Sequence, residues 1–225
     1  MDEIKGKNMP RKQILKVLVG SQAHGLADKD SDYDYRAVYV DQTSEILSLG
    51  HKYKGSDWIE GKEDNTSYEI GHFLQLATRC NPTILEVFMA PEIRTTEDGK
   101  KLQELFQYVW NPKDSFNAFV GYAHNQRKKM IDKKSGRQDK FSVAYIRTLI
   151  NLIFLLHSKS FDLKVKTAYK SRLLQIRQGK WSAGKVLDWA DKLQKKAFTE
   201  YQNCNQVQSI DKVNEFLLDI RKRYW

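Results

Sequence analysis

The spacing of apolar residues changes along the chain, and the change predicts two structural halves. Short apolar runs bounded by turn residues predict strands over 13–19 and 33–40. Apolar residues at helical spacing dominate the second part of the chain. We therefore expect a half that mixes strands and helices over residues 1–110 and an all-helical half over residues 111–225.

Breaks in the helical pattern indicate where the helices end. In the first half, one helix is expected to begin at Glu69 and to end at Asn81-Pro82, because the residue before a proline is pushed out of the helical region. Thr95 or Thr96 is expected to cap the helix that closes this half. In the second half the spacing predicts helices over 114–130, 140–156, 182–202 and 209–223.

The stretch between the two predicted strands, GSQAHGLADKDSDYD over 20–34, carries the clearest chemistry. Asp32 and Asp34 are two residues apart, so in an extended segment both carboxylates point to the same face. Two like charges held side by side repel unless a cation lies between them, and Mg²⁺ prefers such oxygen ligands. The pair therefore predicts a divalent metal site.

The beginning of the same stretch predicts a phosphate site. Gly20-Ser21 opens a turn and a short helix over 21–26, whose first backbone N–H groups can meet a phosphate. Metal-binding carboxylates that face a phosphate cradle are the layout of a phosphoryl- or nucleotidyl-transfer site. A further carboxylate is expected from a third strand over 63–68.

Composition and cysteine content narrow the class of protein. The content of 40% apolar and 12% aromatic residues favours a folded globular protein over a disordered one. No apolar run approaches the roughly 20 residues that span a bilayer, and the N-terminus lacks the apolar core of a signal peptide. Cys80 and Cys204 form no CxxC pattern, so we expect free thiols, a cytoplasmic location and no membrane partner.

The net charge of +10 is distributed unevenly. Residues 1–110 contain 14 Lys and Arg against 18 Asp and Glu, a net charge of −4, whereas residues 111–225 contain 24 against 10, a net charge of +14. A basic half beside an acidic, metal-binding half is typical of an enzyme that acts on polyanions. A lysine-rich solubilising surface explains the charge alone equally well.

An ordered set of motifs extends this interpretation. It consists of Gly20-Ser21, Gly25, Ser31-Asp32-Tyr33-Asp34, Asp64 with Tyr68-Glu69, and Asn81-Pro82 with Glu86. The helical half adds Gly121-Tyr122-Ala123 with Gln126, Lys140 with Arg147, and the run Leu173 to Gly179. The set resembles the DNA polymerase β-type nucleotidyltransferase superfamily, and within it the branch of predicted nucleotidyltransferases associated with RNA ligases. The resemblance covers most of the chain from about residue 14 to 185.

The resemblance implies a fold and an activity. The fold would be α+β, with a mixed sheet and flanking helices in a catalytic domain over 1–110 and a basic helical domain over 111–225. The activity would be Mg²⁺-dependent transfer of a nucleoside monophosphate from a nucleoside triphosphate, ATP or another, with release of pyrophosphate. Asp32 and Asp34 would hold two Mg²⁺ ions, with Mn²⁺ as an alternative metal, and Asp64 would complete the site. Glu63 and Glu69 are alternatives for that third carboxylate.

The resemblance also implies nucleotide-binding residues. Gly20, Ser21 and Ser31 would hold the triphosphate from one side, and Lys140 and Arg147, two turns apart on one helical face, from the other.

Other interpretations of these residues stay open. Lys140 and Arg147 also fit a basic stripe, and His24 fits either a phosphate contact or a turn histidine with its hydrogen bonds satisfied. Many relatives carry a His where this chain has Ala144 beside Tyr145. If that His acts in catalysis, this protein lacks it, and if it only packs or binds substrate, Tyr145 is the candidate to replace it.

The acceptor of the nucleotide is not readable from the sequence. The basic half favours RNA, with end modification or repair as the reaction. The alternatives are nucleotidylation of a protein at the same site, and a non-catalytic nucleic-acid-binding module that keeps the fold.

Overall fold

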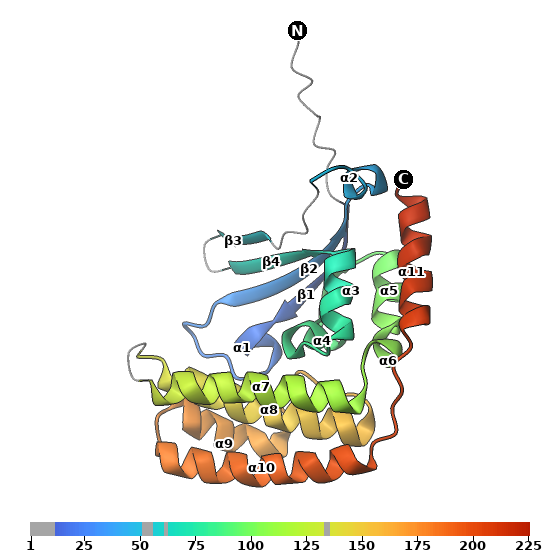
Figure 1. The fold of residues 1–225 in the computed structure, drawn as a ribbon. Helices are drawn as coiled ribbons and strands as arrows, with labels where there is room; N and C mark the ends of the chain where they lie inside the picture. Colours follow the sequence, from blue (N-terminus) through green and yellow to red (C-terminus); the bar gives the residue numbers. More distant parts are fainter. Residues whose placement is uncertain (1–11, 51–55, 61–62, 133–135) are drawn as a thin grey trace.

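The computed structural model describes residues 12–50, 56–60, 63–132 and 136–225, and it has the α+β fold (Figure 1). Within these residues, five strands form one sheet in the order β3-β4-β2-β1-β5. The strands are β1 Lys12–Val19, β2 Tyr33–Val40, β3 Ser56–Glu60, β4 Glu63–Glu69 and β5 Glu92–Thr95. The strands predicted over 13–19 and 33–40 are therefore confirmed to within one residue.

The strand register brings the polar motifs to one end of the sheet. β1 and β2 are antiparallel, and Val19, the last residue of β1, pairs with Asp34. β2 and β4 are parallel, and the Cα of Asp34 pairs with that of Asp64. β1 runs antiparallel to β2, and β2 runs parallel to β4, so the end of β1 and the beginnings of β2 and β4 lie at the same end of the sheet.

Helices of the first half follow the caps in the sequence. They are α1 Gly20–Ala23, α2 Thr43–Ile46, α3 Ile70–Thr78, α4 Pro82–Met89, α5 Glu97–Glu104 and α6 Phe106–Val109. Pro82 occupies the first turn of α4, where its missing N–H costs nothing, and the Asn81 side chain accepts a hydrogen bond from Thr83 N at 3.0 Å. Thr96, one of the two expected caps, accepts from Gly99 N at the start of α5.

The second half is built around one apolar helix. Its helices are α7 Pro112–Ile131, α8 Gln138–Ser158, α9 Thr167–Arg177, α10 Ala183–Asn203 and α11 Ile210–Arg223. α8 packs against α7, α9 and α10, and α4 connects the sheet half to α7 (Figure 1). Among the described helices, α8 alone is long and apolar enough to cross a membrane, but 67% of its apolar window is buried inside the structure. Such burial is that of a core helix.

The last helix returns to the sheet half. α11 packs against α3 and α6, on the far side of the molecule from α9 and α10 (Figure 1). Arg221 forms an ion pair of 2.7 Å with Glu69, and Arg223 forms one of 2.6 Å with Asp98. The expected division at residue 110 assigns α11 to the helical domain, whereas its contacts are with the first half. One apolar core runs through both halves.

Candidate active site

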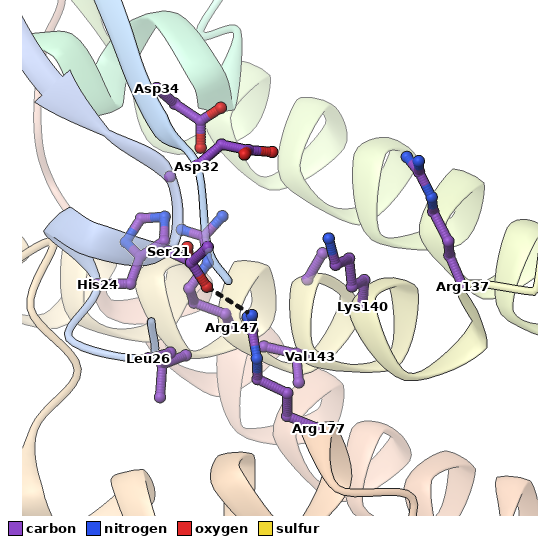
Figure 2. A pocket seen from close by; sticks show the side chains of 13 residues that line it. Ser21, His24, Leu26, Asp32, Asp34, Arg137, Lys140, Val143, Arg147 and Arg177 are labelled. Carbon is purple, nitrogen blue, oxygen red and sulfur yellow. Dashed lines mark hydrogen bonds between the residues drawn. The ribbon is translucent and has the colours of Figure 1, made fainter. Parts of the chain in front are cut away.

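A cavity of about 340 Å³ opens where the sheet half meets α8 (Figure 2). The turn after β1 and the start of β2 supply Gly20, Ser21, Asp32 and Asp34 to its wall. α8 and the residue before it supply Arg137 and Lys140, which lie across the cavity from the two aspartates (Figure 2). The cavity therefore has an acidic side and a basic side, formed by different halves of the chain.

The acidic side is held against the turn. Asp32 is exposed, and Asp34 is half-buried in β2. A Cβ atom added to Gly20 would lie 1.8 Å from Asp34 Oδ2, and Gly20 has a φ of +66°, which favours glycine. Gly20 therefore lets the carboxylate of Asp34 lie directly against the turn, close to the first N–H groups of α1.

Replacing Gly20 with alanine tests this packing. Gly20→Ala should lower the free energy of unfolding by about 1–2 kcal/mol for the positive φ and by about 1–3 kcal/mol more for the clash with Asp34. Gly50→Ala is the matched control, because Gly50 has a φ of +82° but open space around its added Cβ. Urea unfolding of both variants measures the difference. Equal losses in the free energy of unfolding would show that the Asp34 side chain moves away from the added methyl group without destabilising the fold.

The third carboxylate lies at the edge of what the structure describes. The register pairs Asp64 with Asp34, whereas Glu63 pairs with Tyr33. Glu69 is unavailable, because its side chain caps α3 through Gly71 N at 2.7 Å and pairs with Arg221. Among the side chains that the structure describes, no group of three or more His, Cys, Asp or Glu could hold a metal ion. The side chain of Asp64 lies outside that set, and its role stays a prediction.

Two cations that the sequence predicts for nucleotide binding have different surroundings. Lys140 is exposed and lines the cavity. Arg147 also lines the cavity, but it is buried and donates a short hydrogen bond to Glu86. Burial opposes ionisation of Glu86, but the charges of Arg147, His24 and Arg36 and the hydrogen bond from Arg147 together outweigh it, so the pKa of Glu86 is lowered. The pair ties α8 to α4, and Lys140 is the member of the predicted stripe that faces open space.

His24 lies between α1 and this buried pair. Its Nδ1 is 3.1 Å from the carbonyl oxygen of Leu163, and its Nε2 is 3.9 Å from Glu86 Oε2. Burial, and then the charge of Arg147, lower the pKa of His24 from 6.5 to about 4. His24 is therefore neutral at pH 7, with Nδ1–H donating to Leu163. Of the two interpretations of this residue, the geometry favours the satisfied histidine over a charged phosphate ligand.

The lowered pKa of His24 makes stability depend on pH. Between pH 6.5 and about 4, His24 binds a proton in the unfolded chain but not in the folded one. Neutral His24 therefore contributes its full share to the free energy of unfolding above pH 6.5, and this share is lost as the pH falls. We expect a loss of about 2 kcal/mol between pH 7 and pH 5. Urea unfolding at both values measures it. His24→Asn, which keeps a donor for Leu163, should remove most of the loss, and an unchanged loss would contradict the assignment.

Arg177 joins the site through a contact that the sequence analysis missed. Its guanidinium bonds Asp28 Oδ2 through Nε at 3.1 Å and Nη2 at 2.7 Å, and Nη2 also donates to Ser31 Oγ at 2.9 Å. Ser31 Oγ in turn donates to Asp28 Oδ1. Hydrogen bonds from Ser31 and Arg177 lower the pKa of Asp28 to about 2. The helical half thus clamps the loop before Asp32, and Ser31, predicted to hold phosphate, takes part in the clamp.

Ala144, where many relatives carry a histidine, and its neighbour Tyr145 point to different places. Ala144 lines the cavity, whereas Tyr145 does not and is 3% exposed. Burial raises the pKa of Tyr145, and the charges that act on it belong to Arg127 and Asp191, on α7 and α10. Tyr145 therefore does not face the cavity at the place of the histidine, because successive residues of a helix point about 100° apart. A packing role for Tyr145 stays a prediction.

Comparison with known proteins identifies the family. Residues 1–219 match the family model RlaP, described as an RNA repair pathway DNA polymerase beta family. Among solved structures, the spectinomycin adenyltransferase of Enterococcus faecialis, solved with ATP and spectinomycin, is 12% identical to this chain, with a TM-score of 0.43. The match covers 83% of this chain and 92% of the adenyltransferase chain. A nucleotidyltransferase-like protein of Exiguobacterium sibiricum is 7% identical, with a TM-score of 0.31. That match covers 94% of this chain and 74% of the neighbour's chain. A search of curated protein sequences finds no match. Because the family model matches nearly the whole chain, the protein belongs to the RNA repair pathway DNA polymerase beta family and is a nucleotidyltransferase.

Proposed function

We propose that the protein transfers a nucleoside monophosphate from a nucleoside triphosphate to a hydroxyl group of RNA, with Mg²⁺ as the metal. The observation that carries the proposal is the two-sided cavity, in which Asp32 and Asp34 line one side and Lys140 and Arg137 lie opposite. A triphosphate with its metal carries both negative oxygens and a cation, so it matches both sides.

The carboxylates fit a hard divalent cation. Asp32 and Asp34 supply oxygen donors, and Gly20 leaves the space that Asp34 Oδ2 occupies beside the turn. These two residues, with Asp64 as the third by resemblance, would hold the ion. A bound Mg²⁺ polarises the phosphoryl oxygens and stabilises the charge that develops during displacement.

The remaining groups of the cavity bind and orient the substrate. The first N–H groups of α1 meet phosphate oxygens, as the free donors at a helix start do. Lys140 and Arg137 neutralise the pyrophosphate as it leaves. In the reaction the acceptor oxygen forms a bond to the α-phosphorus, the bond from that phosphorus to the bridging oxygen of the β-phosphate breaks, and the proton of the acceptor hydroxyl passes to solvent. Through its ion pair with Glu86, Arg147 holds α8 and its cations in place against α4.

Two observations support RNA as the acceptor. The family is described as belonging to an RNA repair pathway. Residues 111–225 carry a net charge of +14, which attracts a polyanion before any specific contact forms.

The proposal is tested with nucleoside triphosphates labelled at the α-phosphate, offered one at a time with Mg²⁺ or Mn²⁺. RNA oligonucleotides and an unrelated protein serve as separate acceptors. Label on RNA, abolished by a chelator, is the expected result. Label on protein alone would overturn the choice of acceptor. RNA binding without any label transfer, unchanged in Asp34→Asn, would indicate a non-catalytic binding module.

A further inference from the structure

A second cavity, of about 870 Å³, shares α1 with the active site. Ser21 and His24 of this turn line the active-site cavity, whereas Gln22 and Ala23 line the second one. The short helix therefore forms the wall between them. Opposite α1, the segment before α9 and its first turns supply three lysines, and we call this cavity the lysine groove after Lys164, Lys166 and Lys170.

The three lysines give the groove a surplus of positive charge. Lys164 and Lys170 converge over Gly25, where an added Cβ would lie 3.5 Å from Lys164 Cγ and 3.8 Å from Lys170 Nζ. Lys166 lies with Nζ 4.0 Å from the centre of the Phe154 ring. None of the three forms an ion pair with another described residue, and Asp162 is the acidic residue in the lining. Cations that gather without acidic partners favour an anionic ligand.

The charge continues along α9 toward the active site. Residues 163–180 contain six Lys and Arg and no Asp or Glu. Another cavity, of about 410 Å³, shares Thr167 and Lys170 with the lysine groove and continues to Leu174 and Gln178, which flank Arg177 of the active site. α9 has 11 residues, so this path is about 16 Å long. An extended track of this length fits a chain of phosphates, whereas a single anion would occupy one end.

We propose that the lysine groove and α9 bind the backbone of a single-stranded RNA whose reactive end enters the active-site cavity. The inference rests on the proposed function, because it assigns the path of that acceptor. Lysines along a groove contact phosphates without reading the bases, as grooves that track single strands do. The apolar floor, from Leu18, Met89 and Pro91, leaves room for sugars between the phosphate contacts.

The test compares two triple variants of the full chain. Lys164→Gln/Lys166→Gln/Lys170→Gln removes the groove charges. Lys192→Gln/Lys195→Gln/Lys196→Gln removes three exposed charges from α10, outside the lining of both cavities. Fluorescence anisotropy with a labelled single-stranded RNA of about 20 nucleotides gives the affinity at several salt concentrations.

We expect the groove variant to bind RNA at least about tenfold more weakly and the plot of log affinity against log salt to become shallower by about 2, at roughly 0.7 for each lost phosphate contact. The affinity of the α10 variant for RNA should stay within about twofold of wild type.

Equal losses of RNA affinity in both variants, or no loss in either, would overturn the assignment of the groove as the RNA site. Binding of free ATP by the groove as tight as that of RNA, and lost in the groove variant, would overturn the strand path. Lys164→Gln/Lys166→Gln, at two exposed positions, repeats the test should the triple variant unfold.

The outcome for the groove is separable from that for the proposed function. If wild type binds RNA through the groove but transfers no label to it, the groove stands and the proposed activity fails. If wild type labels RNA and the groove variant does so with an unchanged KM for RNA, the activity stands and the groove is refuted.

Discussion

Asp32→Asn and Asp34→Asn should each lower nucleotidyl transfer by roughly 10³-fold, because each removes a negative oxygen donor from the acidic side of the cavity while keeping the shape of the side chain. Asparagine supplies one neutral oxygen in place of the carboxylate. The bound metal would therefore be held more weakly, and the variants should need a higher Mg²⁺ concentration. Initial rates of label transfer across a Mg²⁺ series measure both effects.

Asp30→Asn is the matched control for these variants. Asp30 is exposed and lies two residues before Asp32 in the same loop, and it does not line the cavity. The variant should keep full activity. If Asp30→Asn lost as much activity as Asp32→Asn, or if Asp34→Asn kept the wild-type rate at low Mg²⁺, the assignment of the metal-binding carboxylates would be wrong.

Arg221→Met should lower the free energy of unfolding by about 3–5 kcal/mol, because it leaves the carboxylate of Glu69 buried without a counter-charge. Glu69 is 0% exposed, and its Oε1 lies 2.7 Å from Arg221 Nη2. These two atoms lack the alignment of a hydrogen bond, so their attraction is chiefly that of the charges. Urea unfolding of the variant measures the loss.

The neighbouring Lys222 supplies the control for Arg221. Lys222 is exposed on the same turn of α11, so Lys222→Met removes a positive charge without uncovering a buried one, and the change should be within about 0.5 kcal/mol. The double variant Arg221→Met/Glu69→Gln should recover part of the stability, since no charge is then left buried. A loss in Arg221→Met no larger than in Lys222→Met would show that α11 does not hold Glu69 through this pair.

Elements whose own residues carry a strong period were predictable. β1 and β2 follow continuous apolar runs, and α7, α8 and α10 each contain apolar residues at helical spacing over about twenty residues. α9 was missed, because just two of its side chains, Leu173 and Ile176, are buried. β5 was also missed, since its four residues are mostly exposed and form a strand by pairing with β1.

The residues of the site also fall into a predictable group and an unpredictable group. Gly20, Ser21, Asp32 and Asp34 lie within fifteen residues, and local geometry alone predicts that these residues gather. The partners of Arg147 and Arg177 were not predictable, because Glu86 is 61 residues from Arg147 and Asp28 is 149 residues from Arg177. Such pairs form only when separate elements pack, and no local period records them.

By itself the sequence determined the two halves, the strand-turn-strand stretch with its aspartate pair, and the uneven distribution of charge. The tertiary structure decided which carboxylates are available and which cations face the cavity. Strand register set Asp64 beside Asp34, while burial against α11 removed Glu69 from consideration. The physical reason is that a charged side chain in a short segment has the same local pattern whether it meets solvent, substrate or an opposite charge, and packing between distant segments chooses among these.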